Sequence, residues 1–245
     1  MARSVPSSPL LCIAHRGGSQ LFSENTLAAF TESLALGVDA IELDIWNIGG
    51  ELLVTHDRRL GKTLPGQGRL IDHHPQQLKE LILECGNRLT TLPEVLELVG
   101  NQVMLNIELK GPNCVDGVAS ALESYARDHQ AGFDHYVISS FDHRQLYDFK
   151  QCLPQVKRGV LVEGVPLDYA ACADALEAYS FHPSINFINQ ELVNDAKVRG
   201  LQVWVYTVNE EEDMQWMVEL GVDGVFTDFP RRLLAFNHEN TIQDR

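Results

Sequence analysis

Histidine, arginine and acidic residues stand where short apolar runs of this sequence end. The first run closes in Ala14-His15-Arg16-Gly17-Gly18. An arginine offers a planar fork of donors that fits a phosphate, a histidine titrates near neutral pH, and the glycines leave backbone N–H groups accessible. His15 and Arg16 are therefore candidates for binding and reacting with an anionic group. The alternative is a strand end that merely carries a surface charge.

Two later runs carry charged residues at alternate positions. Glu42 and Asp44 share one run, and Glu108 and Lys110 share another. Residues two apart on a strand point to the same face, so each pair converges. Two buried carboxylates repel each other unless a cation lies near them, and hard divalent ions prefer carboxylate oxygens. The three acids could hold a metal and Lys110 a phosphate oxygen, with ordinary ion pairs as the alternative.

A second imidazole stands at His56, in Thr55-His56-Asp57. Two histidines on either side of a phosphorus centre could share acid–base work, since one can take the proton of the attacking oxygen while the other protonates the departing alkoxide. Most of the remaining seven histidines stand in polar loops or at helix ends. Among those seven, His182, just before Pro183, is the one to follow in a structure.

Glu24-Asn25-Thr26 precedes the first amphipathic run. Ser23 or Asn25 is the expected N-cap of a helix there, and Glu24 suits the positive end of the helix dipole. The sequence does not determine whether Glu24 and Asn25 have a role beyond capping.

The elements that must position these residues alternate between short apolar runs and longer amphipathic ones, the pattern of repeated strand–helix units. The expected strands are residues 10–15, 40–46, 103–109, 136–140, 159–162, 184–189, 202–206 and 224–227. The expected helices are residues 26–36, 115–129, 144–152, 168–178, 190–199, 211–220 and 230–236. Eight strands favour an α/β fold with a closed parallel (β/α)₈ TIM barrel over an open doubly wound sheet. The candidate residues would then meet at one mouth.

One stretch interrupts the alternation after the second strand. Residues 51–56 read as an additional short strand, and residues 57–88 carry several glycines and prolines with a short helical piece at 76–83. We expect residues 51–90 to be a small insertion on a βα loop of a single domain spanning 1–245, at the face where barrels build active sites. The polar tail from Asn237 is expected to fray.

The net charge, the cysteines and the short apolar runs limit the binding partners and the cellular location that we expect. A formal net charge of -15 repels nucleic acid and anionic membranes, although local cations or a metal can still attract a small anion. Five cysteines without a Cys-x-x-Cys pair favour reduced thiols over disulfides or zinc. The apolar run 10–14 is too short for an export signal or a membrane span, so we expect a cytoplasmic protein without stable membrane association. A homo-oligomer is compatible with the sequence, which does not fix the number of subunits.

Taken together, the motifs resemble those of the glycerophosphodiester phosphodiesterases of the cytoplasmic bacterial type. The resemblance rests on His15-Arg16-Gly17, Glu24-Asn25-Thr26, Glu42-x-Asp44, His56-Asp57, Glu108-x-Lys110, Thr207-Val208-Asn209 and the stretch from Gly221 to Asp228, which follow the family's order over residues 10–235. It implies a barrel with a small inserted subdomain. It also implies metal-dependent hydrolysis of glycerophosphodiesters to sn-glycerol 3-phosphate and an alcohol, a reaction of glycerol and lipid metabolism.

The resemblance also implies roles for individual residues. These are an acid/base pair of His15 and His56, ligands of one Mg²⁺ or Ca²⁺ at Glu42, Asp44 and Glu108, and phosphate contacts from Arg16 and Lys110. The glycerol 2-hydroxyl would attack phosphorus in line, and water would open the resulting cyclic phosphate. Tyr206 stands where the family often has tryptophan and would line the pocket wall, and Ser23 replaces a common proline. These departures affect the choice of alcohol rather than the reaction.

Three alternatives stay open. A Schiff-base enzyme would use Lys110 as its nucleophile, but the neighbouring carboxylates would raise the pKa of that amine. A noncatalytic barrel could bind metal or phosphate alone. A lysophospholipase D-type enzyme would need an apolar patch beside the mouth. Since residues 61–68 offer few large apolar side chains, we expect small substrates such as glycerophosphocholine or glycerophosphoethanolamine, with lysolipids hydrolysed poorly.

Overall fold

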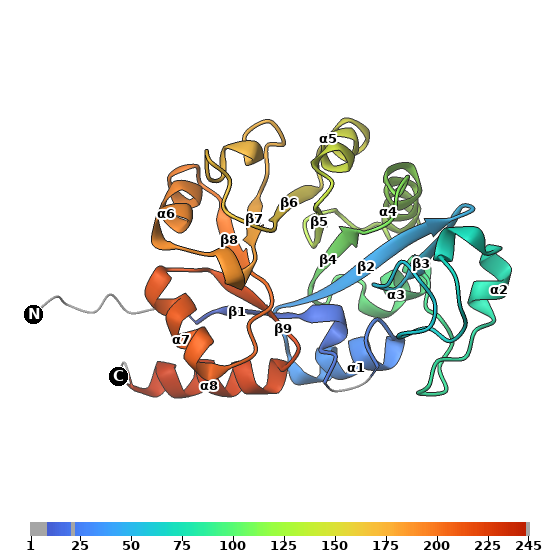
Figure 1. Ribbon diagram of the computed structural model, residues 1–245, viewed down its shortest axis with the longest axis horizontal. Coiled ribbons are helices and arrows are strands. Elements are labelled where there is room, and N and C mark those ends of the chain that lie inside the picture. The colour runs from blue at the N-terminus through green and yellow to red at the C-terminus, as the bar shows by residue number, and fades with distance from the viewer. Residues whose placement is uncertain (1–8, 21–22, 244–245) are drawn as a thin grey trace, which may run out of the picture.

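Eight parallel strands close into a ring in the computed structural model, which describes residues 9–20 and 23–243 (Figure 1). The barrel strands are β1 (Leu11–Ala14), β2 (Ala40–Ile48), β4 (Met104–Leu109), β5 (Tyr136–Ser140), β6 (Lys157–Val162), β7 (Ser180–Pro183), β8 (Gln202–Val205) and β9 (Gly224–Thr227). β1 pairs in parallel with both β9 and β2, which closes the ring. The predicted (β/α)₈ barrel is confirmed.

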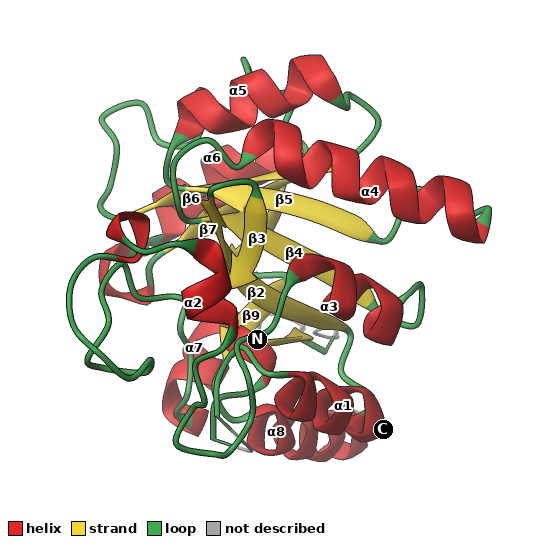
Figure 2. Ribbon diagram, turned by 90° about the vertical axis from the view of Figure 1, so that its right-hand side faces the viewer, coloured by secondary structure: helices red, strands yellow, loops and turns green. Residues whose placement is uncertain are grey.

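Helices surround the strands (Figure 2). They are α1 (Leu27–Leu36), α2 (Pro75–Lys79), α3 (Leu92–Val99), α4 (Val115–His129), α5 (His143–Cys152), α6 (Gln190–Val198), α7 (Glu211–Leu220) and α8 (Pro230–Gln243). Their packing follows from sequence spacing. In α4, for example, Val115, Val118, Ala119 and Leu122 are buried, a spacing that puts four apolar side chains on one helical face toward the strands.

The insertion after β2 begins with β3 (Glu51–Val54), which pairs antiparallel with β2. The segment has a small apolar core of its own, in which Leu64, Leu70 and Leu78 are buried with Trp46. Beyond β3, the Thr55 N–H donates to the Asp44 carbonyl oxygen over 3.0 Å. The insertion thereby brings its loop alongside β2 at the barrel mouth.

Two predicted elements between β6 and β8 are wrong. Residues 184–189 are not a strand. They follow β7 and contain a 3₁₀ turn at Ile185–Phe187. β7 itself was not predicted from the sequence. Its buried side chains Ser180 and His182 are polar and contact each other, so this strand lacks an apolar pattern. Residues 168–178 form successive turns rather than an α-helix, with a 3₁₀ turn at Ala171–Ala173.

Two further differences concern helices. Of the tail predicted to fray, residues 237–243 instead continue α8, and residues 244–245 lie outside the described part of the chain. The Asn237 side chain accepts from the Leu10 N–H (3.2 Å) and donates to the Leu10 carbonyl (2.8 Å). Helix α3 was not predicted. Its N-terminus is a capping box in which the Glu94 carboxylate accepts from the Thr91 N–H (2.8 Å), an interaction that stabilises a short helix.

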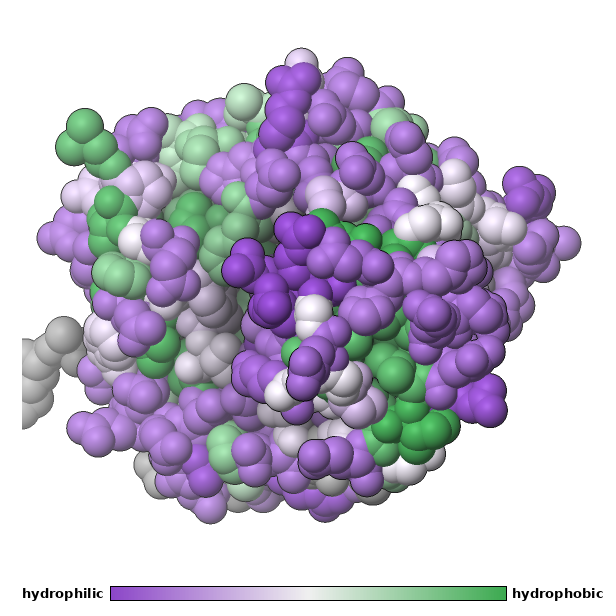
Figure 3. All heavy atoms as spheres, turned by 45° about the vertical axis from the view of Figure 1, so that its right-hand side comes forward, coloured by the Kyte–Doolittle hydropathy of each residue, from purple (hydrophilic) through white to green (hydrophobic). Residues whose placement is uncertain are grey.

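The surface and the thiols agree with the composition. The face shown in Figure 3 is mainly hydrophilic, and hydrophobic side chains reach it in separate patches. All five cysteines are free. Within residues 9–20 and 23–243, no helix has the length and apolar content to cross a bilayer.

Candidate active site

A pocket of about 220 Å³ opens where the barrel strands end, and its two sides differ in chemistry. Charged side chains come from β2 and β4 or from the residues just after β1, β3 and β4, namely Glu42, Glu108, His15, Arg16, His56 and Lys110. Apolar side chains lie at the ends of β5, β6, β8 and β9, namely Phe141, Leu161, Tyr206 and Phe226. The residues predicted from the sequence thus line one cavity with a polar and an apolar side, and Tyr206 lies in its wall. Asp44 is the exception, because it does not line the cavity but lies beside Glu42 and Glu108.

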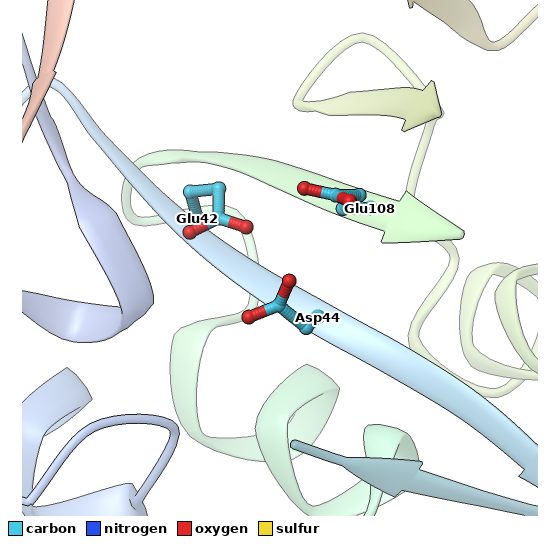
Figure 4. Close-up of side chains that lie close together, drawn as sticks. All are labelled: Glu42, Asp44 and Glu108. Carbon is cyan, nitrogen blue, oxygen red and sulfur yellow. The ribbon is translucent and has the colours of Figure 1, made fainter. Parts of the chain in front are cut away.

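Three carboxylates converge on the polar side. Glu42 and Asp44 come from β2 and Glu108 from β4, where Asp44 and Glu108 are register partners. One oxygen of each lies within 4.8 Å of those of the other two, and Figure 4 shows the three groups facing a common space. All three residues are buried. Glu42 Oε1 and Asp44 Oδ1 find no hydrogen-bond partner within the described part of the chain.

The protonation of these acids reflects their crowding. Burial, with the charges of Asp44 and Glu108, raises the pKa of Glu42 well above its usual range. Burial and the Asp44 charge raise the pKa of Glu108 to about 7. Burial opposes ionisation of Asp44 as well, but Lys110 and Arg16 outweigh it and lower the pKa of that carboxyl. Such a set of hard oxygen donors, two of them without a hydrogen bond among the described residues, fits a divalent cation that would relieve the repulsion.

Arg16 is held by carboxylates on several sides. Its backbone N–H donates to Glu42 Oε2 (2.8 Å), and Nη1 donates to both oxygens of Glu24 (3.1 Å each). Nε lies 3.5 Å from Asp44 Oδ2. A backbone φ of 52° turns Arg16 out of the strand so that both its N–H and its side chain face β2. Glu24 therefore does more than favour a helix dipole, because it fixes the guanidinium at the pocket.

Lys110 lies next to two of the acids. Nζ donates to Glu108 Oε1 over 2.7 Å and lies 3.5 Å from Asp44 Oδ1. Burial would lower the pKa of the amine, but these carboxylates outweigh it and raise the pKa. A charged Lys110 can attract a phosphate oxygen. It is unsuited to act as a Schiff-base nucleophile, which needs a depressed pKa.

His15 has a carboxylate partner from the last strand. His15 Nδ1 donates to Asp228 Oδ1 over 2.8 Å, which leaves Nε2 to exchange a proton. Asp228 also accepts from the Ser19 hydroxyl and from Asn209 Nδ2, each over 2.8 Å. Burial would raise the pKa of Asp228, but the bonds from His15 and Asn209 hold it well below its usual range. Asp228 stays ionised and orients the imidazole.

His56 has a similar partner within the insertion. Nδ1 donates to Asp57 Oδ1 over 3.1 Å, and Asp57 in turn accepts from the Thr63 hydroxyl (3.0 Å) and from Lys62 (3.3 Å). Burial lowers the pKa of His56, with help from the charges of Lys110 and Arg16, and outweighs the Asp44 charge that would raise it. Each of the two pocket imidazoles is therefore oriented by a carboxylate through Nδ1.

Sequence reasoning missed several residues that support the site. Asn25 is not a helix cap: Thr26 caps α1, and the buried Asn25 Nδ2 donates to Asp44 Oδ2 over 3.0 Å. Asn106 lines the pocket, donates to the Ser139 hydroxyl over 2.9 Å, and keeps Oδ1 unpartnered among the residues described. Its spacing of two residues from Glu108 was the available signal. Asp228 and Asn209 belonged to quoted motifs but were given no role.

His182 lies away from this site. Its ring is fully buried in the barrel, 2.7 Å from the Ser180 hydroxyl and stacked on Trp204 at 5.0 Å between centroids. Burial lowers its pKa to about 3. His182 is a neutral core residue.

Comparison with known proteins points to one family. A sequence model of the glycerophosphoryl diester phosphodiesterase family matches residues 15–232. A glycerophosphodiester phosphodiesterase of Caldanaerobacter subterraneus subsp. tengcongensis is 36% identical over 91% of this chain and 96% of its own length. One from Bacillus altitudinis is 32% identical over 92% and 97%. A phosphodiesterase from Oleispira antarctica, solved with the product sn-glycerol-3-phosphate, has a TM-score of 0.83 at 27% identity and covers 91% of this chain and 95% of its own.

Proposed function

The chain belongs to the glycerophosphoryl diester phosphodiesterase family, and from that premise we propose that it cleaves glycerophosphodiesters to sn-glycerol 3-phosphate and an alcohol in the pocket described. The observation that carries the proposal is the convergence of Glu42, Asp44 and Glu108 beside a cavity lined by both His15 and His56. The product bound to the Oleispira phosphodiesterase supports a substrate of this class.

Arg16 and Lys110 are the phosphate-binding residues of the proposal. Arg16 presents a guanidinium fixed by Glu24, and Lys110 an ammonium fixed by Glu108. Both side chains are ordered before substrate arrives, so little conformational freedom is lost on binding. Glu42, Asp44 and Glu108 would hold one Mg²⁺ or Ca²⁺. Such an ion lowers the pKa of a nearby hydroxyl and neutralises charge on phosphate oxygens.

The two histidines carry the proton transfers. In the first step the glycerol 2-hydroxyl attacks phosphorus, one imidazole takes its proton, and the other protonates the departing alkoxide. In the second step water opens the cyclic phosphate and the two imidazoles exchange roles. Asp228 and Asp57 each stabilise the imidazolium that forms on their partner histidine, since both are held ionised by hydrogen bonds.

We further infer that the chain works as one catalytic unit. Residues 51–90 supply His56 and its partner Asp57, so the site includes the insertion together with the barrel strands. The cytoplasmic location remains a prediction of the sequence, as does the compatibility with a homo-oligomer.

A lysophospholipase D-type activity is the second candidate, and one observation favours it. Phe141 lines the pocket and is 43% exposed, and Val165 and Leu167, 44% and fully exposed, follow the pocket residue Glu163 closely. An acyl chain could rest on such a rim. The apolar side chains lie on the loops after β5 and β6 rather than on the insertion. Small diesters remain the proposed substrates, and comparing glycerophosphocholine with lysophosphatidylcholine separates the two.

A coupled assay for released glycerol 3-phosphate tests the proposal. We expect chelation by EDTA to abolish release, and His15→Ala and His56→Ala each to reduce kcat/KM by about 10²–10⁴-fold, the scale of general acid–base catalysis. His238→Ala is the matched control, because His238 is an exposed residue of α8. Full activity after chelation, or in either pocket variant, would refute the assignment.

A further inference from the structure

The apolar side of the pocket carries one charged group among the lining residues described. Phe141, Leu161, Tyr206 and Phe226 form this side, with Ser139 and Thr207 as neutral polar neighbours. The carboxylate of Glu163 lies with them, two residues beyond Leu161 at the end of β6. An acid opposite the phosphate-binding residues needs a reason, because it repels an anionic substrate.

Tyr206 holds this carboxylate in place. The Tyr206 hydroxyl lies 2.9 Å from Glu163 Oε2 and 2.8 Å from the Val162 carbonyl oxygen, so its one hydrogen is shared between two acceptors. The Glu163 side chain is otherwise exposed, and a carboxylate accepts up to about four hydrogen bonds. Glu163 therefore keeps most of its capacity to pair with a positive group.

Two aromatic rings stand beside the carboxylate. The Phe141 and Tyr206 rings meet edge to face, with centroids 5.7 Å apart and an interplanar angle of 87°. An aromatic face attracts a cation through its quadrupole, and a carboxylate nearby adds charge attraction. Lys110 Nζ lies 5.4 Å from the centroid of the Phe141 ring. The Phe141 ring thus contacts Tyr206 and also lies near the proposed phosphate-binding lysine. A group attached to the bound phosphate could therefore reach the two rings and Glu163.

From these contacts we propose that Glu163, Phe141 and Tyr206 bind a cationic alcohol group of the substrate, with a quaternary ammonium as the best fit. The proposal rests on the proposed function, since it names the alcohol on the far side of the phosphate. Methylated ammonium groups bring apolar surface together with positive charge, which matches rings backed by an acid. The hydroxyls of glycerol need hydrogen-bond partners, and the polar side of the pocket offers more of these.

A pair of isosteric substrates tests the charge directly. One is sn-glycero-3-phosphocholine, and the other is the diester of 3,3-dimethylbutanol, in which carbon replaces the ammonium nitrogen. We expect the wild-type protein to prefer the choline diester about tenfold in kcat/KM, the scale of a cation held by aromatic rings. Glu163→Gln keeps both rings but removes the negative charge, so it should reduce this ratio about fivefold. Tyr206→Phe keeps the ring, removes the anchor of the carboxylate, and should reduce the ratio about threefold.

The controls separate failure of this site from failure of the enzyme. Glu212→Gln removes an exposed acid of α7 outside the pocket and should leave the ratio unchanged. A wild-type ratio near one, or a Glu163→Gln variant that slows both diesters equally, would overturn the cation site while glycerophosphodiester hydrolysis stands. No hydrolysis of either diester would instead refute the proposed function. Should Glu163→Gln fold poorly, inhibition of the wild-type protein by choline but not by 3,3-dimethylbutanol decides the matter.

Discussion

His15 and Asp228 are 213 residues apart in sequence, yet His15 Nδ1 lies 2.8 Å from Asp228 Oδ1. The contact exists because the barrel closes: Ala14 of β1 and Thr227 of β9 are register partners, so the residues that follow them emerge side by side. Asn209, after β8, completes the arrangement by donating to Asp228 Oδ2 and accepting from the Asp228 N–H. Closure of the sheet thereby orients a proposed catalytic imidazole.

This relationship predicts the effect of Asp228→Asn. The variant keeps the shape of the side chain but loses the charge that stabilises the imidazolium and fixes the tautomer. We expect kcat/KM to fall about 10–100-fold, less than for His15→Ala, whose loss is set by general acid–base catalysis itself. The assay is glycerol 3-phosphate release, with circular dichroism to verify folding. Ser19→Ala, which removes one neutral donor to the same carboxylate, should be far milder, and equal losses in the two variants would contradict the assignment.

Substitution of Asn25 is expected to weaken metal binding although Asn25 is not one of the proposed metal ligands. Its Nδ2 donates to Asp44 Oδ2, and its backbone φ is 58°. Asn25→Gly tolerates that φ and Asn25→Ala does not, so the alanine variant should be less stable by about 1 kcal/mol. Both variants lose the amide and should bind the divalent ion about 10–100-fold more weakly. Wild-type metal affinity in Asn25→Gly would show that the amide does not support Asp44.

The burial of His182 predicts how the free energy of unfolding depends on pH. Its pKa is about 3 in the folded protein because it is buried, and about 6.5 in the unfolded chain. Between these values the unfolded chain binds the additional proton, so the free energy of unfolding falls as pH falls from about 6.5 toward 3. His182→Gln should reduce this slope by up to about 1.4 kcal/mol per pH unit in urea titrations between about pH 4.5 and 6. An unchanged slope in His182→Gln, or the same change in His238→Gln, would contradict the prediction.

Much of the barrel could be predicted from the sequence because its signals are local. β5, β9, α4 and α7 have the predicted bounds, since each is one apolar or amphipathic run between clear ends. The helix predicted over residues 168–178 is wrong for a physical reason. They are rich in helix formers, but Ala170, Ala173 and Leu176 are buried at a spacing of three. That spacing suits successive 3₁₀ turns, which the i to i+3 hydrogen bonds confirm.

In the candidate site, too, some contacts follow from local rules of sequence and others do not. The convergence of Glu42, Asp44 and Glu108 follows from alternation along strands and from parallel neighbours, both of which are local rules. The contacts of Asn25 with Asp44 and of Glu24 with Arg16 depend on positive φ angles in the loop after β1, which sequence spacing does not reveal. The contact of Asp228 with His15 could not be predicted without knowing that β1 and β9 are neighbours in the closed barrel.

The central claim, that three carboxylates hold one divalent cation, is tested most directly by calorimetric titration of metal-free protein with Mg²⁺ and Ca²⁺. We predict one ion per chain, with stability rising by about 2.7 kcal/mol at a hundredfold excess over Kd. Glu42→Gln should weaken binding strongly yet leave the metal-free protein at least as stable as the wild type, because it removes one of three repelling acids. A wild-type protein that binds neither ion, or a Glu42→Gln variant that binds as tightly as the wild type, would contradict the account.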